Sequence, residues 1–283
     1  MVAFRKRADT VTLPPMFWQR AITTFTIGPL ALLLIYLGGL FYFIPLFLIL
    51  SLATYEYATL LKAVRIRVPL WLLMPSVWLQ LLAGYWPDRG LTAPFMIVSL
   101  LAVIIYALWS YEQMRTDSSV AEWLATMAGI LLLGWVGSHF FRLRQFGGAE
   151  VEAAKWTILA MVSTWVSDSG AYLVGTWRGK RKLARRLSPN KTVEGYIGGI
   201  LLGIPLTVFL GWLLQLPILV VLLIGVLISI FGTAGDLSIS LLKREAGVKD
   251  SGHMLPGHGG ALDRVDSLLW TVTLAYYVVH YLL

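Results

Sequence analysis

The feature that most limits what this chain can fold into is a series of about nine apolar runs spread over its 283 residues. A helix needs about 20 consecutive apolar residues to cross a hydrocarbon layer of roughly 30 Å. Only 13% of the residues are charged, and the mean hydropathy is +0.74. The sequence therefore predicts an all-α, polytopic membrane bundle of about nine transmembrane helices. The expected spans are 21–38, 41–61, 68–86, 91–109, 120–141, 155–176, 194–215, 218–242 and 265–283.

Basic residues gather on one side of this predicted bundle. If the N-terminus is cytoplasmic, all but four of the 23 Lys and Arg lie in cytoplasmic segments. The four exceptions are Arg89, Arg142, Arg144 and Lys155. Because short cytoplasmic loops are enriched in Lys and Arg, we expect a cytoplasmic N-terminus. These short loops also account for the net charge of +8. Membrane lipids with anionic headgroups, or a soluble polyanion, are therefore expected partners, and nucleic acid is not.

The chain is expected to be a single membrane domain, residues 1–283, because no loop between the apolar runs exceeds about twenty residues. Residues 1–150 carry few acids in their apolar runs and are expected to form a scaffold toward lipid or toward another protomer. Residues 151–283 are expected to provide catalytic helices and cytoplasmic loops, since acids within membrane segments usually face a bundle interior or a wet cavity. The acids of this second part are Asp168, Asp236, Asp263 and Asp266.

The sixth predicted span ends in the stretch WVSDSGAYLVG. At helical spacing Asp168, Tyr172 and Gly175 fall on one face, so a carboxylate and a phenol are expected to look together into the bundle. The alternative is that the helix is already leaving the membrane there, and that Asp168 is merely solvated.

A basic loop, RGKRKLARRLSPNKTVEG, follows this span. Its first part is equally well explained by the ordinary clustering of basic residues on the cytoplasmic side. The second part is more specific: Pro189 fixes a turn, Lys191 provides a point charge suited to phosphate, and Glu194 opens the next helix. A carboxylate at a helix N-terminus is expected to cap amides or to hold a cation.

The eighth predicted span ends in GTAGDLSISLLKRE. Asp236, Ser240 and Lys243 lie at positions i, i+4 and i+7, so an acid, a hydroxyl and a base share one stripe of a helix that emerges into the cytoplasm. The alternative is that Asp236 pairs with a lysine and is simply neutralised.

The stretch LPGHGGALDRVDS is a glycine-rich turn that runs into a helix starting near Ala261. Such a turn lets backbone amides approach an anion, and a helix N-terminus adds positive potential. Asp263 and Asp266 occupy the first turn on a shared face, where they are expected to bind a hard cation such as Mg2+, although acids there also serve as simple caps. With no cysteine and no HExxH motif in the chain, a zinc site is not expected.

These stretches bring acids suited to a divalent metal and bases suited to phosphates to the cytoplasmic ends of the last four helices. Metal ions and basic clamps are what phosphoryl or nucleotidyl transfer requires. The membrane setting favours a substrate with an anionic head and an acyl tail. Residues alone predict no more than this.

The stretch SLLKREAGVKDSGHMLPGHGGALDRVD, residues 240–266, resembles the signature of the phosphatidate cytidylyltransferases, also called CDP-diacylglycerol synthases. WVSDSGAYLVG and SPNKTVEG also resemble family stretches, so the resemblance is strong over residues 160–283. It implies an enzyme that joins CTP and phosphatidate, with one or two Mg2+ ions, to give CDP-diacylglycerol and pyrophosphate. It also implies, by analogy with bacterial members, a protein of the cytoplasmic (inner) membrane with its active site facing the cytoplasm.

The resemblance implies roles for individual residues. The expected metal ligands are Asp236 and Asp263, followed by Asp168 and Asp266. The expected contacts to triphosphate and phosphatidate oxygens are Lys191, Lys243, Arg244, Lys249 and Arg264, and the expected phosphate-approach turn is Gly257, His258, Gly259 and Gly260. Ser188 and Tyr172 complete the expected substrate-binding set, and Asp250 is expected to orient Lys249 or to contact the metal. The catalytic group proper is expected to be Asp236, Asp263, Lys243, Asp250 and Arg264.

Two other functions compete with this interpretation. One is a CTP-dependent transferase or kinase that acts on another lipid, and the other is an ion-coupled transporter, since intramembrane acids also serve transport. A transporter is less favoured because the acids crowd one end of one half of the chain. The small residues of GYIGGILLG, residues 195–203, permit close helix contact and so allow a homodimer.

Overall fold

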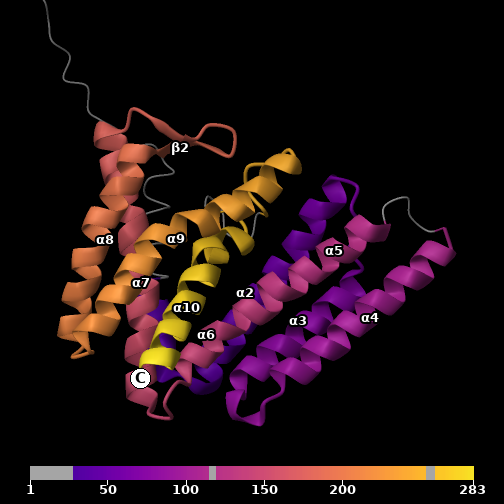
Figure 1. Cartoon of the computed structure of the whole chain (residues 1–283), viewed down its shortest axis with the longest axis horizontal. Coiled ribbons are helices and arrows are strands. Elements are labelled where there is room, and N and C mark those ends of the chain that lie inside the picture. Colours follow the sequence, from indigo (N-terminus) through magenta and orange to yellow (C-terminus); the bar gives the residue numbers. More distant parts are fainter. Residues whose placement is uncertain (1–27, 115–118, 253–258) are drawn as a thin grey trace, which may run out of the picture.

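The computed structural model describes residues 28–114, 119–252 and 259–283, and nearly all of this is helix (Figure 1). After a helix at residues 28–37, the elements are α2 (Gly39–Ala63), α3 (Leu70–Tyr85), the 3-10 helix η1 (Pro87–Arg89), α4 (Thr92–Glu112), α5 (Ser119–Gly129), the π-helical segment η2 (Ile130–Val136), α6 (Gly137–Arg144), α7 (Glu150–Arg178), β1 (Lys182–Ala184), β2 (Ser188–Thr192), α8 (Val193–Leu213), α9 (Ile218–Glu245) and α10 (Leu262–Leu282).

Five of the described helical stretches are long and apolar enough to cross a membrane. They are α2, α4, the continuous stretch Ser119–Arg144, α8 and α9. The helix at residues 28–37 and α3 are apolar but shorter, and α7 and α10 are long but not among the five. The all-α membrane fold is confirmed, whereas the count of nine spans and the side of the N-terminus remain predictions.

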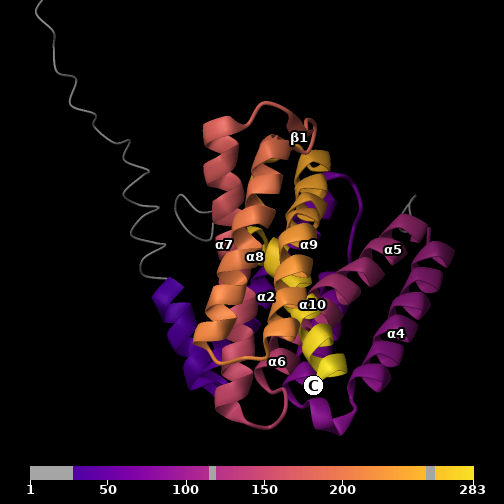
Figure 2. The same ribbon diagram turned by 60° about the vertical axis from the view of Figure 1, so that its left-hand side comes forward.

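The last four helices pack as one group, with α7, α8 and α9 side by side and α10 behind α9 (Figure 2). Glycines bring α8 close to α7: a Cβ atom on Gly195 would lie only 2.7 Å from the carbonyl oxygen of Ala171, and one on Gly198 would strike Val174. Gly199 and Gly203 are likewise buried. These glycines therefore serve packing within the chain, so the predicted close helix contact is confirmed, with α7 as the partner helix, and the homodimer remains a prediction.

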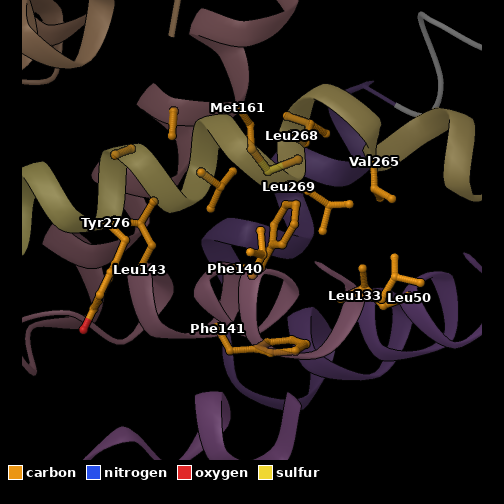
Figure 3. Packing of buried hydrophobic residues seen from close by; sticks show 14 of the residues in the cluster. Leu50, Leu133, Phe140, Phe141, Leu143, Met161, Val265, Leu268, Leu269 and Tyr276 are labelled. Atoms are coloured by element: carbon orange, nitrogen blue, oxygen red, sulfur yellow. The ribbon is translucent and has the colours of Figure 1, made fainter. Parts of the chain in front are cut away.

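A buried cluster joins the two parts of the chain where α2, α6 and α10 meet. Phe140 of α6 points toward Leu269 of α10, while Leu50 of α2 lies beside Leu133 of η2 (Figure 3). All four side chains are at most 1% exposed. In a membrane bundle, close packing of such side chains, more than their removal from water, stabilises the contact between helices. The cluster fixes α2 alongside α10, so the last turns of α2 reach the start of α10.

The basic loop after α7 forms a short antiparallel hairpin, which the sequence did not predict. Lys182 pairs with Thr192 and Ala184 with Ser188, with an irregularity between the two pairs. The hairpin is tied to α8 at its base, because Glu194 accepts hydrogen bonds from the backbone N–H groups of Lys180 and Arg181, both at 3.0 Å. Glu194 thus binds amides, and it also pairs with the Arg181 guanidinium at 3.0 Å, so it holds a cationic side chain as well.

Candidate active site

The ends of five helices lie at one pole of the molecule, on the same side as the hairpin (Figures 1 and 2). They are the C-terminal ends of α2, α7 and α9 and the N-terminal ends of α8 and α10. The expected spans place the same five ends on the cytoplasmic side. Most of the predicted site residues lie here, and their contacts fall into three groups.

The first group is an ion pair between the hairpin and α9. Lys191 of β2 binds the Oδ2 atom of Asp236, and the two side chains keep 27% and 30% of their surface exposed. Ser240, one turn further along α9, donates to Asp236 Oδ1 at 3.3 Å. The sequence placed Asp236 and Ser240 on one stripe, and this is confirmed, as is the alternative that a lysine neutralises Asp236. Because the pair is accessible, an anionic ligand is able to compete for Lys191.

The second group surrounds Asp263 at the start of α10. Lys243 donates to Asp263 Oδ1 at 2.6 Å, and both side chains are at most 10% exposed. Asp263 Oδ2 accepts from Ser251 N at 2.8 Å and from Gly260 N at 3.0 Å, and Ser251 Oγ lies 3.1 Å away. Three N–H donors converge on one carboxylate, so Asp263 holds the chain segments on either side of it together.

The third group is a set of acids from three helices. The charges of Asp168 on α7, Asp236 on α9 and Asp266 on α10 act on one another across the space between the helices. Asp168 is exposed and receives a hydrogen bond at 3.5 Å from Ser267 Oγ, whereas Asp266 is 9% exposed and accepts from Ser267 N at 2.6 Å. The cations that act on this set are Lys191, near Asp168, and Lys243, near Asp266.

The donor set suits a Mg2+ ion that arrives with a nucleotide. Within residues 28–114, 119–252 and 259–283, no three acid or histidine side chains form a group that would hold a metal by themselves. Mg2+, however, is usually bound through one or two carboxylates together with substrate phosphates and water, and seldom by a cage made only of protein. Carboxylates from α9 and α10 meet that requirement, so the residues fit the ion.

The other predicted substrate contacts differ in their exposure and in their partners. Arg244 donates from Nε to Leu187 O at 2.9 Å and from Nη1 to Val248 O at 3.1 Å, so it ties the hairpin turn to the end of α9. Lys249, Asp250 and Arg264 are exposed at the same pole, and Ser188 is half-buried in β2. The prediction that Tyr172 looks into the bundle is wrong, because this side chain is 71% exposed on the outer face of α7.

The glycine turn is described only in part. Gly257 and His258 lie outside the described residues. Gly259 has a φ of 78°, a left-handed conformation that favours glycine. The amide of Gly260 donates to Asp263, so that amide is engaged within the chain.

Glu56 of α2 is a residue of this pole that the sequence did not assign to the site. Its carboxylate, 6% exposed, accepts from Ser251 Oγ at 2.7 Å and from the backbone N–H groups of Ala261 and Leu262, both at 2.9 Å. The signal in the sequence is that Glu56 is an acid within an apolar run. Its partners are about two hundred residues away, so no local pattern indicates them.

Comparison with known proteins identifies relatives along nearly the whole chain. Residues 18–282 match the cytidylyltransferase family. The chain is 34% identical over 266 residues to the phosphatidate cytidylyltransferase of Bacillus subtilis. The aligned region covers 92% of this chain and 97% of that protein. It is 33% identical over 290 residues to the phosphatidate cytidylyltransferase of Synechocystis, which covers 94% and 97%. A protein of the same name from Staphylococcus aureus is 43% identical over 147 residues, which are 51% of this chain and 55% of that protein.

Proposed function

The chain belongs to the cytidylyltransferase family, and we propose that it transfers the cytidylyl group of CTP to phosphatidate, giving CDP-diacylglycerol and pyrophosphate. Two full-length relatives bear the name of this activity. The observation in the structure that best supports it is the accessible Lys191–Asp236 pair beside Asp168 and Asp266, at the pole where the helices end. An anionic headgroup and a nucleotide triphosphate are able to meet there.

The reaction makes modest demands on acid–base chemistry. An oxygen of the phosphatidate phosphate attacks the α-phosphorus of CTP, the bond from that phosphorus to the bridging oxygen breaks, and pyrophosphate leaves with the bonding electrons. The nucleophile is already anionic, so a strong general base is not needed. What the chain has to provide is alignment of two anions and neutralisation of the charge between them.

Among the four predicted metal ligands, Asp236 and Asp266 are the ones we assign to Mg2+, with Asp168 beside them. The ion, when bound, would neutralise phosphate charge and hold the triphosphate in line. Asp263 already accepts three hydrogen bonds from N–H groups, which favours a role in holding Lys243 and the neighbouring backbone. Lys191 and Lys243 are the side chains we assign to phosphate oxygens.

A double-label experiment tests the proposed reaction. Purified protein is incubated with phosphatidate and CTP that carries a radiolabel on either the α- or the γ-phosphate. Cytidylyl transfer puts the α-label, and not the γ-label, into the lipid phase. A lipid kinase would put the γ-label there, and a transporter would put neither. Either of these two results would overturn the proposal.

Lys191→Ala should raise the apparent KM for CTP or for phosphatidate by on the order of 10-fold, which corresponds to about 1.4 kcal/mol of lost binding. The reason is that Lys191 must leave Asp236 to meet a phosphate, and alanine removes that contact. Initial rates at varied concentrations of each substrate measure the effect, with Lys182→Ala on the exposed outer strand of the same hairpin as the control. Unchanged kinetics for both substrates would limit Lys191 to a role in membrane orientation.

The proposed orientation has nine spans, a cytoplasmic N-terminus and the active-site pole in the cytoplasm of a bacterial cell. The chain has no cysteine, so a single introduced cysteine is the one thiol that a maleimide can label. In intact cells whose outer membrane has been permeabilised, an impermeant maleimide should label Arg89→Cys and should leave Arg185→Cys unlabelled until the inner membrane is opened. The reverse pattern would invert the topology.

A further inference from the structure

Glu56 reaches the active-site pole from the half of the chain that the sequence assigns to scaffold. It lies near the C-terminal end of α2, and both of its carboxylate oxygens are engaged: Oε1 by Ala261 N, and Oε2 by Leu262 N and Ser251 Oγ. Its partners lie on both described flanks of the glycine turn, residues 250–252 and 259–262, which we call the loop flanks. Glu56 is thus a single point at which both flanks are held.

The contact satisfies the start of α10 in an unusual way. The first N–H groups of a helix have no partner within the helix, and a side chain just before the helix normally accepts from them. Here the acceptor comes from more than two hundred residues earlier in the chain. A carboxylate at this end also interacts favourably with the helix dipole. The entry of α10 is therefore set by α2.

The loop flanks are shaped to fit this carboxylate. A Cβ atom on Gly252 or on Gly260 would collide with the Glu56 carboxylate group. Alanine at either position would push the carboxylate away from its three donors. Glycine at these two positions is thus explained by the approach of Glu56, independently of any need to approach phosphate.

Ser251 connects Glu56 to the site residues. Its hydroxyl lies 2.7 Å from Glu56 Oε2 and 3.1 Å from Asp263 Oδ2, and its backbone N–H donates to the same Asp263 oxygen. The other oxygen of Asp263 holds Lys243. With the hydroxyl of Ser251 donating to Glu56 and its backbone N–H to Asp263, a series of hydrogen bonds runs from Glu56 through Ser251 and Asp263 to Lys243. The members are buried, with Ser251 at 8% and Lys243 at 8% exposed.

We propose that Glu56 is a positioning residue for cytidylyl transfer, which fixes the loop flanks and, through Ser251 and Asp263, the ammonium group of Lys243. The proposal rests on the proposed function. Glu56 itself does not touch substrate. It follows that residues 1–150 contribute to catalysis as well as to the scaffold.

The test is Glu56→Gln, which keeps the shape of the side chain but turns one acceptor into a donor that faces a backbone N–H. A misplacement of about 1 Å costs on the order of 100-fold in rate. We expect kcat to fall by roughly 10- to 100-fold, with the KM values for CTP and phosphatidate close to those of the wild type. The matched control is Glu122→Gln, another buried acid of the first half, which accepts from Arg67 N at 3.2 Å and lies on α5, a helix that packs mainly against α4. The control should keep the wild-type kcat.

A double-mutant cycle separates positioning from simple stabilisation. Glu56→Gln and Ser251→Ala interrupt the same series, so their combined loss in kcat should be clearly smaller than the product of the separate losses. In a second cycle, the losses in kcat/KM caused by Glu56→Gln and by Lys191→Ala should multiply, because Lys191 lies outside this series. Multiplicative losses in the first cycle would overturn the proposal. So would a wild-type kcat in Glu56→Gln together with a lowered thermal midpoint, because Glu56 would then be only a helix cap.

Amide hydrogen exchange gives a readout that does not depend on activity. In Glu56→Gln the amides of Ala261 and Leu262 should exchange faster than in the wild type, and in Glu122→Gln they should not. If the wild type makes no CDP-diacylglycerol, the proposed function fails, and faster exchange would still show that α2 holds the loop flanks. Unchanged exchange would remove the structural basis of the proposal.

Discussion

Asp236→Asn is expected to abolish nearly all cytidylyl transfer while leaving the protein folded and inserted. The side chain is 30% exposed, and its neighbours are the hydroxyl of Ser240 and the flexible Lys191, so an amide fits without strain. An amide carries no charge and is a weak ligand for a hard cation. Removing one preorganised electrostatic contact from an active site typically costs 100- to 1,000-fold in kcat, and we expect a loss of about this size.

The measurement is turnover of purified protein at a series of Mg2+ concentrations, with thermal unfolding in detergent as the check on folding. The control is Asp88→Asn. Asp88 is an exposed acid in η1, away from the active-site pole, and this variant should behave like the wild type. The double variant Asp236→Asn with Lys191→Ala removes both members of the ion pair. If Asp236 served only to neutralise the charge of Lys191, the double variant would recover activity. Recovery would contradict the assignment of Asp236 to the metal.

The helices of this protein were predictable because the signal is local. The length of an apolar run decides whether a helix forms in lipid, and α8 and α9 begin within a residue of the expected positions. The stripe of Asp236 and Ser240 was predictable for the same reason, since the helical repeat fixes which side chains share a face.

The contacts between elements were not predictable, because they depend on how each helix is rotated about its axis. Tyr172 lies one turn after Asp168 on α7, yet its side chain is exposed on the outside of the bundle. The glycines of α8 looked suited to a partner, and α7 occupies them. Glu56 was visible as an acid in an apolar run, but its partners in the loop flanks follow only from the packing of α2 on α10.

Asp263→Asn is expected to lose nearly all activity by a different route from Asp236→Asn, and with a large loss of stability. Asp263 and Lys243 form a pair in which neither side chain is more than 10% exposed. Removing one partner of a buried pair leaves an uncompensated charge and typically costs about 3–5 kcal/mol. The side-chain amide of asparagine has only one acceptor oxygen. It can therefore accept either from Lys243 or from the backbone N–H groups of Ser251 and Gly260, but not from both sides. The thermal midpoint should therefore fall, and excess Mg2+ should not restore turnover.

The companion variant is Asp263→Asn with Lys243→Met, which removes the unpaired charge while keeping the volume of the side chain. Because apolar replacement of a buried ion pair is often neutral or stabilising, the double variant should regain most of the lost thermal stability. It should remain inactive, since the ammonium group assigned to phosphate is gone. The opposite result for the single variant, a wild-type thermal midpoint with activity that returns as Mg2+ is raised, would make Asp263 a metal ligand. The series from Glu56 would then end at the cation instead of at Lys243.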